Sequence, residues 1–402
     1  MKILFYNHTG TVSGAERVLL QILSPLNRNS FDCLVVCPTR GALSDMVAEA
    51  GVACEPVAEL KARFTWRVDY FLRYLVSFAQ IIKQLRKEIV KAEPDLVHAN
   101  SIRAGLAATV ATAGFRVPVI WHLHDLLPPH PLSTAIRWFA ACSTRVRLLA
   151  VSQSVADNFR GHVLRWIGAH VPVAVIHNGI DLDKFKLDAA NKQAIRDELQ
   201  LHDAEFVIGS IGQITPRKRQ LELLEAFAFT HAQMPRAVLL VVGEPLFNQD
   251  HLYLQQLINT AHELEIADRV RFIGARNDVA AIMRALDVLV VNSQSEAFAL
   301  VILEAMACGT PVVATAVGGT PEAIRHQDNG WLVPPGDEKA LADALITLKN
   351  EPALRAQFAT RSQEKVTARF NSHSYIAELE DFYRQNVAPE SSAEPAQMTA
   401  GS

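Results

Sequence analysis

The sequence has few cysteines and lacks a long apolar run. Its five cysteines, among 402 residues, are scattered, and no pair has the spacing of zinc ligands. We therefore expect reduced thiols in a cytoplasmic protein. No apolar stretch approaches the roughly 18 residues of a membrane span, and the opening MKILFYNH lacks the long apolar segment of a signal peptide. These absences disfavour a disulfide-rich secreted domain and an integral membrane protein.

A strong net charge is also absent, because the formal charge at pH 7 is −3. Residues 1–185 nevertheless hold 20 Lys and Arg against 14 Asp and Glu, a balance of +6, which leaves −9 for the remainder. A basic first half favours an anionic partner or a membrane surface. It is equally compatible with solvated surface charge that is unevenly spread. No nucleic-acid partner is expected.

Short β-branched runs alternate with amphipathic stretches along the whole chain. This order predicts parallel sheets covered by helices on both faces. The pattern restarts after a polar linker at residues 181–190, so the predicted fold is α/β, with two Rossmann-like domains facing each other across a cleft that holds the ligand. The expected strands are KILFYN, DCLVVCP, DLVHAN, PVIWHLHD, RLLAVS and PVAVIHN, then FVIGSIGQ, AVLLVVGE, RVRFIG, DVLVVN, PVVAT and GWLVP.

The expected domain boundaries follow from this restart. Residues 1–183 form the first domain and residues 184–371 the second. A helix at 372–388 and a polar, disordered tail at 389–402 complete the chain.

The loop after the first strand, NHTGTVSG, contains Gly10 and Gly14 and leads into a helix. Glycines there let the backbone approach a ligand, and a helix start offers free N–H groups to an anion. An ordinary tight turn explains the loop equally well. It is not a GxGxxG motif, and the second strand ends near Arg40 rather than at an acidic residue, which disfavours a nicotinamide dehydrogenase.

Two further loops carry candidate chemistry. In WHLHDLLPPHP, His122 and His124 are placed on one face of a strand, but no third metal ligand stands at a helpful spacing. His124 is therefore expected to be a neutral hydrogen-bonding group in the cleft. In SIGQITPRKRQ, Arg217, Lys218 and Arg219 precede a helix. They suit a diphosphate, or they form a solvated basic turn.

The stretch SEAFALVILEAMACG is almost wholly apolar yet carries Glu296 and Glu304. In a continuous helix the two would lie about 12 Å apart along the axis and about 80° apart around it. Glycosidase carboxylates lie about 5–10 Å apart across one bond, so a hydrolytic pair is disfavoured. The spacing suits the two ends of an extended ligand. The N–H groups of Phe298, Ala299 and Leu300 would face a phosphate between them.

These residues resemble glycosyltransferase family 4, the retaining transferases of GT-B fold. The resemblance covers nearly all of residues 1–387. It rests on the Glu-x7-Glu pattern of SEAFALVILEAMACGTPVVATAVGGTPEAI, supported by VIHNGID, SGAERVLL and DLVHANS. It implies a nucleotide-sugar donor on the second domain, a sugar or lipid-linked acceptor on the first, and front-face transfer of a hexosyl unit with retention. The final helix would return to the first domain.

The resemblance also implies roles for single residues. Glu304 would hold the donor ribose, Glu296 the donor sugar and Lys218 the diphosphate. Gly14 would lie near that phosphate and His124 near the sugar, while the amides of Phe298, Ala299 and Leu300 would meet sugar or phosphate. With Glu296, His124 and Lys218 as catalytic groups, the remaining expected donor-binding residues are Glu304, Gly14, Gln213, Arg217, Phe298, Ala299 and Leu300.

The sequence departs from the family pattern at two positions. Gln213 stands where many members have arginine, so Arg217 or Arg219 would have to supply that charge. Ala299 replaces a common glycine, and alanine tolerates helical angles. No Asp-x-Asp motif lies at a cleft loop, and Asp181–Asp183 falls in the linker, so neither a metal nor another cofactor is expected.

Alternatives remain open from the sequence. A nucleotide-sugar epimerase, a phosphorylase or a catalytically silent GT-B binding protein would share the scaffold. Residues 63–91 mix aromatic, leucine and basic positions on a helical pattern. They form either a helix lying on the inner face of an anionic membrane or a domain helix with a solvated basic face.

Overall fold

The first sheet is parallel and seven-stranded, with the order β3-β2-β1-β4-β5-β6-β7. In the computed structural model the described residues are 1–28, 31–60, 68–166, 172–185, 189–201, 206–246 and 250–387. All residues of β4 and β5 are buried, as expected for strands covered on both faces. The strands are β1 Lys2–Tyr6, β2 Asp32–Cys37, β3 Ala53–Pro56, β4 Leu96–Ala99, β5 Val119–Leu123, β6 Val146–Ala150 and β7 Val173–Val175.

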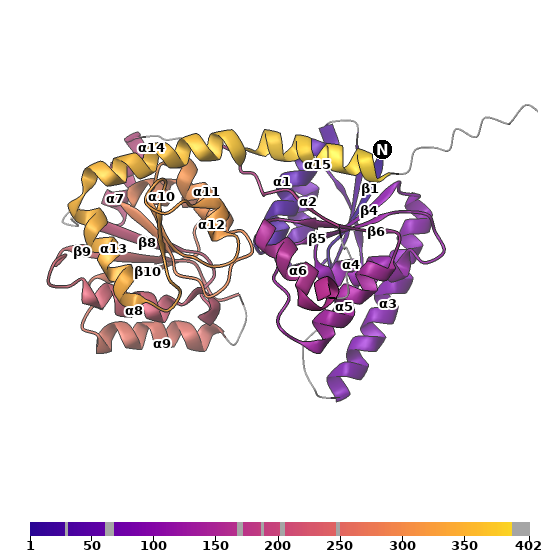
Figure 1. Cartoon of the computed structure of the whole chain (residues 1–402), viewed down its shortest axis with the longest axis horizontal. Helices are drawn as coiled ribbons and strands as arrows, with labels where there is room; N and C mark the ends of the chain where they lie inside the picture. The colour runs from indigo at the N-terminus through magenta and orange to yellow at the C-terminus, as the bar shows by residue number, and fades with distance from the viewer. Residues whose placement is uncertain are drawn as a thin grey trace, which may run out of the picture. The chain divides into compact units, whose positions relative to one another are not determined.

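Helices cover both faces of this sheet (Figure 1). The helix after β4 begins at Ser101, whose Oγ accepts a hydrogen bond from Ala104 N at 3.1 Å and so caps a free amide. The helices of this part are α1 Gly14–Arg28, α2 Leu43–Glu49, α3 Val68–Ala92, α4 Ile102–Ala111, α5 Pro131–Cys142 and α6 Gln153–Trp166.

The second sheet is parallel and six-stranded, with the order β10-β9-β8-β11-β12-β13. Its core buries Phe227, Leu257, Leu345 and Phe358, which four different helices contribute. The strands are β8 Phe206–Ile211, β9 Ala237–Val242, β10 Val270–Gly274, β11 Val288–Val291, β12 Val312–Thr315 and β13 Trp331–Val333. The helices are α7 Ala189–Glu198, α8 Gln220–Phe229, α9 Asp250–Glu263, α10 Val279–Ala285, α11 Leu300–Ala307, α12 Thr320–Ala323, α13 Glu338–Asn350 and α14 Pro352–Arg369, with a 3-10 turn η1 Pro216–Lys218.

The last helix, α15 Ser372–Asn386, ends against the core of the first sheet. Tyr383 on this helix is fully buried, and its Oη lies 2.8 Å from Nδ1 of His98 on β4. His98 Nε2 lies 3.2 Å from Nδ1 of His122 on β5. This buried polar chain fixes the end of α15 on the first sheet, as the fold prediction requires.

Contacts divide the chain into two compact units. One comprises Met1–His122, Ala135–Leu149 and Ile376–Ser402, and the other Leu123–Thr134 and Ala150–Tyr375. The predicted fold class, two parallel-sheet Rossmann-like domains, is confirmed. The domain boundary at 183/184 lies between the two sheets and stays a prediction, and the predicted tail at 389–402 lies outside the described residues.

The cysteines are all free, in agreement with the expectation of reduced thiols. Cys37 and Cys54 lie on the neighbouring strands β2 and β3, with their Sγ atoms 3.5 Å apart. That separation is a contact between thiols and not a disulfide bond.

Candidate active site

The strand order of the second sheet reverses between β8 and β11, which lie side by side. Ligands of open α/β sheets bind beyond the carboxyl ends of the strands at such a switch point. The loops that follow these two strands are residues 212–219 and 292–299. They carry Lys218 and Glu296, so the topology brings together two predicted residues that are far apart in the sequence.

Lys218 and Glu296 form an ion pair at this point. Nζ of Lys218 donates a hydrogen bond to Oε1 of Glu296, and Ser293 Oγ donates to the same oxygen at 2.5 Å. Glu296 is only 7% exposed, so its carboxylate is buried together with these donors. Its second oxygen, Oε2, lies 4.0 Å from Nη1 of Arg217. Glu296 therefore holds Lys218 in place through one oxygen and leaves the other as an acceptor.

The charge state of Glu296 follows from the balance of these contacts. Burial raises the pKa of the carboxyl group, but the charge and hydrogen bond of Lys218 lower it, and Ser293 and Arg217 act in the same direction. The net pKa is below the ordinary value, so Glu296 is ionised at neutral pH. An ionised Glu296 is an acceptor for hydroxyl groups and a counter-ion for Lys218.

A turn after β12 supports the backbone that carries Glu296. Gly318 has φ of +53°, and a Cβ there would lie 1.6 Å from the carbonyl oxygen of Glu296. A Cβ on Gly319 would lie 2.2 Å from the carbonyl oxygen of Ala297, and Gly319 N donates to Glu296 O at 3.1 Å. These two glycines permit a backbone contact that fixes the loop before α11.

Gly318→Ala tests this contact. The substitution is expected to lower the free energy of unfolding by about 2 kcal/mol or more, because alanine is strained at positive φ and its Cβ would displace Glu296. It should also lower turnover. Thermal unfolding and steady-state kinetics measure the two effects. Gly51→Ala is the matched control, since Gly51 has φ of +73° but a Cβ added there would meet nothing within 4 Å. Equal losses in both variants would contradict a role for the Gly318 contact.

Helix α11 begins between the two glutamates of the Glu-x7-Glu pattern. It starts at Leu300, one or two residues later than predicted, and Ala299 is extended with φ −75° and ψ 110°. The amides of Phe298, Ala299 and Leu300 precede the first helical acceptor and so lack partners within the helix. Negative φ at Ala299 shows that no glycine is needed there, although the expected helical angles were wrong. Glu304 lies in the following turn and is half-buried.

The Phe298 side chain has a packing role. It is 6% exposed, and its ring centroid lies 5.0 Å from that of His177 and 5.6 Å from that of Phe370. Only the backbone of Phe298 is thus left for a ligand, in line with the predicted use of its amide.

Comparison with known proteins decides the family. Residues 12–184 match the model described as Glycosyltransferase Family 4, and residues 191–365 match the model described as Glycosyl transferases group 1. N-acetyl-alpha-D-glucosaminyl L-malate synthase from Bacillus anthracis is 32% identical, over 78% of this chain and 79% of its own. The chain belongs to glycosyltransferase family 4.

Further comparisons place this glycosyltransferase among GT-B enzymes. UDP-Gal:alpha-D-GlcNAc-diphosphoundecaprenol alpha-1,3-galactosyltransferase from Escherichia coli is 25% identical over 92% of this chain and 94% of its own. The solved structure of Anabaena HepE in complex with UDP-glucose is 28% identical, with a TM-score of 0.82 over 96% of this chain and 100% of its own. The predicted GT-B fold is confirmed.

The basic loop of this glycosyltransferase uses its three cations differently. Arg217 keeps 52% of its side chain exposed and donates to Ser295 O at 3.1 Å. Arg219 turns away from Glu296, with Nε 2.8 Å from Glu222 and Nη2 3.4 Å from Glu338. Arg217 therefore remains available to a phosphate, whereas Arg219 is used in ion pairs of the second domain.

Gln213 is tied to the start of α9. Its Nε2 donates to Oδ2 of the buried Asp250 at 3.1 Å, and its carbonyl accepts from Gln220 Nε2 at 3.0 Å. The side chain is half-buried. Its contact with Asp250 holds the 212–219 loop and does not make up for the missing arginine charge.

Gly14 is the first residue of α1, one of the helices that cover the first sheet. A Cβ added at Gly14 would have no atom within 4 Å. The helix start is capped by the buried Glu16, which accepts from Ser13 N at 2.9 Å and from Ser13 Oγ at 2.5 Å. The backbone at Gly14 is thus sterically accessible, and its contact with a ligand stays a prediction. Gly10 has a different role, because a Cβ there would lie 1.8 Å from Arg40 O.

His8 and Ser101 were missed by sequence reasoning. They follow β1 and β4, the neighbouring strands at the switch point of the first sheet, and Ser101 Oγ lies 3.1 Å from His8 Nδ1. Burial and the nearby Arg103 lower the pKa of His8 to about 4, so its imidazole is neutral at pH 7. The signal in the sequence was their place directly after two buried strands.

His124 follows β5 and keeps part of its surface exposed. Desolvation lowers its pKa to about 3, so the imidazole is neutral at pH 7, while its hydrogen bond to a sugar stays a prediction. His122 is fully buried beside His98, so the two histidines have different environments. Within the described ranges, no group of three or more His, Cys, Asp or Glu is arranged to hold a metal ion.

Glu322, on the short helix α12, has a structural role as a hydrogen-bond acceptor. Its carboxylate accepts from the amides of Gln153 at 2.8 Å and Ser154 at 2.9 Å, and it lies 2.7 Å from His177 Nε2. Burial raises its pKa, but the His177 hydrogen bond and the two amides outweigh burial and lower the pKa overall. This carboxylate, which lies in the first turn of α12, therefore caps the start of α6.

Glu322→Gln is expected to reduce stability by about 1 kcal/mol at neutral pH, because a neutral amide is a weaker cap. A carboxyl group with a lowered folded-state pKa stabilises the fold above its unfolded value of about 4.3. That contribution is lost as the pH falls through the lower folded value. Thermal unfolding between about pH 3 and pH 8 should show the largest gap from wild type at neutral pH. A gap that stays constant in acid would contradict the assignment.

Proposed function

We propose that the chain is a retaining hexosyltransferase that uses a UDP-sugar donor and a sugar or lipid-linked acceptor. The observation that carries this proposal is the Lys218–Glu296 pair at the β8/β11 switch point, next to the open amides at the start of α11. A cation and amides that have no partner within their helix suit a diphosphate, and carboxylates suit sugar hydroxyls. UDP and UDP-glucose are the ligands named for HepE, and UDP-Gal the donor named for the Escherichia coli relative.

Each residue then has a role in transfer. Lys218 and Arg217 neutralise the leaving diphosphate together with the amides of Ala299 and Leu300, which lowers the barrier to cleavage of the sugar–phosphate bond. Glu304 binds the ribose hydroxyls. Glu296 orients Lys218 with Oε1 and accepts from a hydroxyl of the donor sugar with Oε2.

The acceptor hydroxyl attacks from the face that the diphosphate leaves, so the new bond keeps the anomeric configuration. Its proton passes to the departing phosphate oxygen, and a dedicated protein base is not part of this scheme. Neutral His124 serves as a hydrogen-bonding group to the donor sugar and is not a proton acceptor in the scheme. The positive charge of Lys218, Arg217 and the helix start takes the place of a metal ion, and we therefore propose that transfer is metal-independent.

Calorimetry on the intact chain tests the donor. UDP-sugars are expected to bind more tightly than GDP- or ADP-sugars, and EDTA should leave both binding and transfer unchanged. The anomeric configuration of the product, measured by NMR from the first turnovers, tests retention. The proposal would be contradicted if none of the three donor classes binds at about 1 mM. That concentration corresponds to a binding free energy of about −4 kcal/mol. Donor turnover without transfer would favour the epimerase or phosphorylase alternative.

We also propose peripheral contact with an anionic bilayer through α3. The helix buries Ile81, Leu85 and Ile89 in the first unit but leaves Leu75 44% and Val76 69% exposed. Along the described residues, no helix is both long and apolar enough to cross a bilayer. Residues 63–67 of the predicted segment lie outside the described part of the chain.

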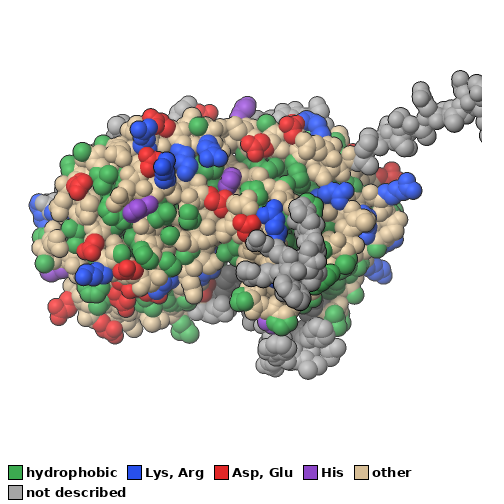
Figure 2. All heavy atoms as spheres, in the orientation of Figure 1, with side chains coloured by type: hydrophobic (Ala, Val, Ile, Leu, Met, Phe, Trp, Pro, Cys, Tyr) green, Lys and Arg blue, Asp and Glu red, His purple; other side chains and the backbone are tan. Residues whose placement is uncertain are grey.

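Flotation with liposomes tests this contact. The protein is expected to float with anionic liposomes at low salt and to stay at the bottom at high salt, because screening weakens the attraction of basic residues. Val76→Asp should reduce flotation, while Phe229→Asp, at a 65% exposed position in the second unit, is the control. On the face drawn in Figure 2, basic and acidic side chains are interspersed among the described residues. No flotation at low salt would remove the proposal.

A further inference from the structure

A cavity of 290 Å³ lies in the second unit at the amino ends of β11 and β12. The proposed donor site lies beyond the carboxyl ends of β8 and β11, so the length of the sheet separates the two. Small-molecule sites span about 300–1,000 Å³, which makes this cavity suitable for a small ligand and too small for a nucleotide-sugar. The main polar side chains lining it are Lys192, Arg284, Asp287, Thr310 and Arg355.

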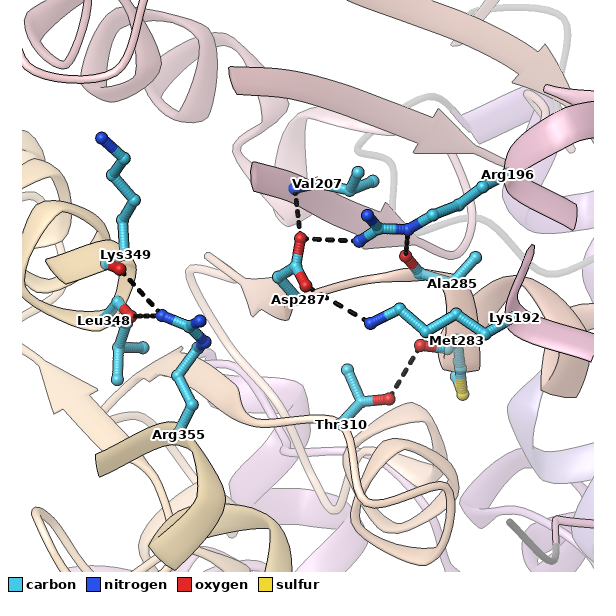
Figure 3. Close-up of polar contacts among 10 residues, drawn as sticks. All are labelled: Lys192, Arg196, Val207, Met283, Ala285, Asp287, Thr310, Leu348, Lys349 and Arg355. Atoms are coloured by element: carbon cyan, nitrogen blue, oxygen red, sulfur yellow. Dashed lines mark hydrogen bonds and ion pairs between the residues drawn. The ribbon is translucent and has the colours of Figure 1, made fainter. Parts of the chain in front are cut away.

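Asp287 supplies the only carboxylate among the lining residues, and both of its oxygens already have partners within the protein. Asp287 Oδ2 accepts from Arg196 Nη2 at 2.7 Å and from Val207 N at 2.8 Å, and Oδ1 lies 3.4 Å from Lys192 Nζ. Figure 3 shows Lys192 and Arg196 reaching Asp287 from one side. Asp287 and Arg196 neutralise each other, which leaves Lys192, Arg284 and Arg355 as a positive lining.

The three cations differ in how many of their N–H donors have a hydrogen-bond acceptor within the protein. Arg355 donates to the carbonyl oxygens of Leu348 and Lys349, the latter at 2.9 Å (Figure 3). Arg284 is different, because its buried Nε makes no hydrogen bond with any described residue. A buried donor without a partner costs free energy. Lys192 Nζ has one distant acceptor and 42% of its side chain exposed. Arg284 and Lys192 therefore have unused donors at the cavity.

We propose that this cavity binds a small dianion of the phosphate class, inorganic phosphate or a phosphate monoester, with Arg284 and Lys192 as its principal donors. A phosphate oxygen gives the Arg284 guanidinium the acceptor that the protein lacks, and two cations match a dianion. The Thr310 hydroxyl already donates to Met283 O at 2.8 Å, so its oxygen contributes only as an acceptor to a protonated phosphate. The site is independent of the proposed function, because its residues lie apart from Lys218 and Glu296.

Isothermal titration of the intact chain with inorganic phosphate, and separately with glycerol 3-phosphate, tests the site at constant ionic strength. Binding is expected with a Kd of about 1 mM or below. Arg284→Met should weaken it about tenfold, the loss of one charge-assisted contact. Lys192→Met should weaken it less. Tighter binding of glycerol 3-phosphate would assign a monoester as the natural ligand, and equal binding would assign the phosphate group alone.

Lys218→Met is the control for binding at the donor site. It should leave the phosphate affinity unchanged if the cavity is the site. Unfolding temperatures without phosphate show whether each variant is folded. The proposal is overturned if neither anion binds at about 10 mM, if folded Arg284→Met binds as well as wild type, or if Lys218→Met abolishes binding.

Discussion

Lys218→Met is expected to lower kcat by about 100-fold or more, with a smaller effect on KM for the donor. Removing one preorganised donor from a developing negative charge costs about 100- to 1,000-fold in rate. The ammonium of Lys218 lies in the 3-10 turn after β8, held by Glu296, so its charge is fixed before the donor binds. Steady-state transfer from a UDP-sugar, with the donor varied, separates kcat from KM.

Arg219→Met is the matched control for this variant. Arg219 is the next cation along the chain but is paired with Glu222 and Glu338. Its loss should lower the unfolding temperature, because two ion pairs are lost, and should leave kcat within about twofold, because its guanidinium is engaged away from Glu296. Equal kcat losses in the two variants would contradict a specific role for Lys218.

The pairing with Glu296 makes a further test possible. In a double-mutant cycle, Glu296→Gln should lower kcat strongly in the wild-type background and much less in Lys218→Met, because Glu296 acts in part through the lysine. Independent, additive effects would show that Glu296 acts on the donor alone. The cycle thus separates the positioning role that the structure shows from the sugar contact that is proposed.

Glu304→Ala is expected to weaken UDP binding by about 100-fold. A carboxylate that accepts from both ribose hydroxyls makes two charge-assisted hydrogen bonds, each worth about 1.5–3 kcal/mol. Glu304 lies in the middle of α11, a turn beyond the open amides, where it faces the same ligand from the opposite end to Glu296 in the proposed scheme. Calorimetry with UDP itself, without a sugar, measures this contact apart from those of Glu296.

The control for Glu304→Ala is Glu225→Ala. Glu225 is an exposed glutamate on α8, a helix that packs on the same sheet as α11. Its removal should leave UDP affinity unchanged. Glu304→Gln is expected to recover part of the binding, because an amide oxygen still accepts a hydrogen bond. If UDP binds Glu304→Ala and wild type equally, the ribose lies elsewhere and the Glu-x7-Glu pattern has another role.

The fold was largely predictable because buried parallel strands are short runs of β-branched and aliphatic residues. The strand that the pattern missed, β3 at Ala53–Pro56, has the sequence ACEP, with no β-branched residue and a proline at its end. It pairs with β2 alone at the edge of the sheet, where neither a continuous apolar run nor a full set of hydrogen-bond donors is needed.

The site was predictable only in its parts. Glu296 and Lys218 were identified separately, as a sugar contact and a phosphate contact. Their ion pair was not, because it depends on β8 and β11 being neighbours although 78 residues separate the two side chains. Arg219 was a candidate phosphate ligand, but its backbone is left-handed, with φ of 53°, and its guanidinium is paired with Glu222 and Glu338. The Lys218–Glu296 and Arg219–Glu338 pairs join residues 78 and 119 positions apart, so they depend on the fold, whereas Arg219–Glu222 is a local i,i+3 pair.

The close backbone contact beneath Glu296 bears on attempts to engineer the donor preference of this enzyme. A library that aims at a new sugar would naturally randomise the residues around the Glu-x7-Glu pattern and the small residues of the following loop. Gly318 and Gly319 should be kept fixed in such a library, since any side chain there would collide with a main-chain oxygen of the 296–297 segment. Diversity is better placed at 294, 295 and 299, which are exposed or half-buried in the loop of the proposed donor site and are not part of the Gly318–Gly319 contact.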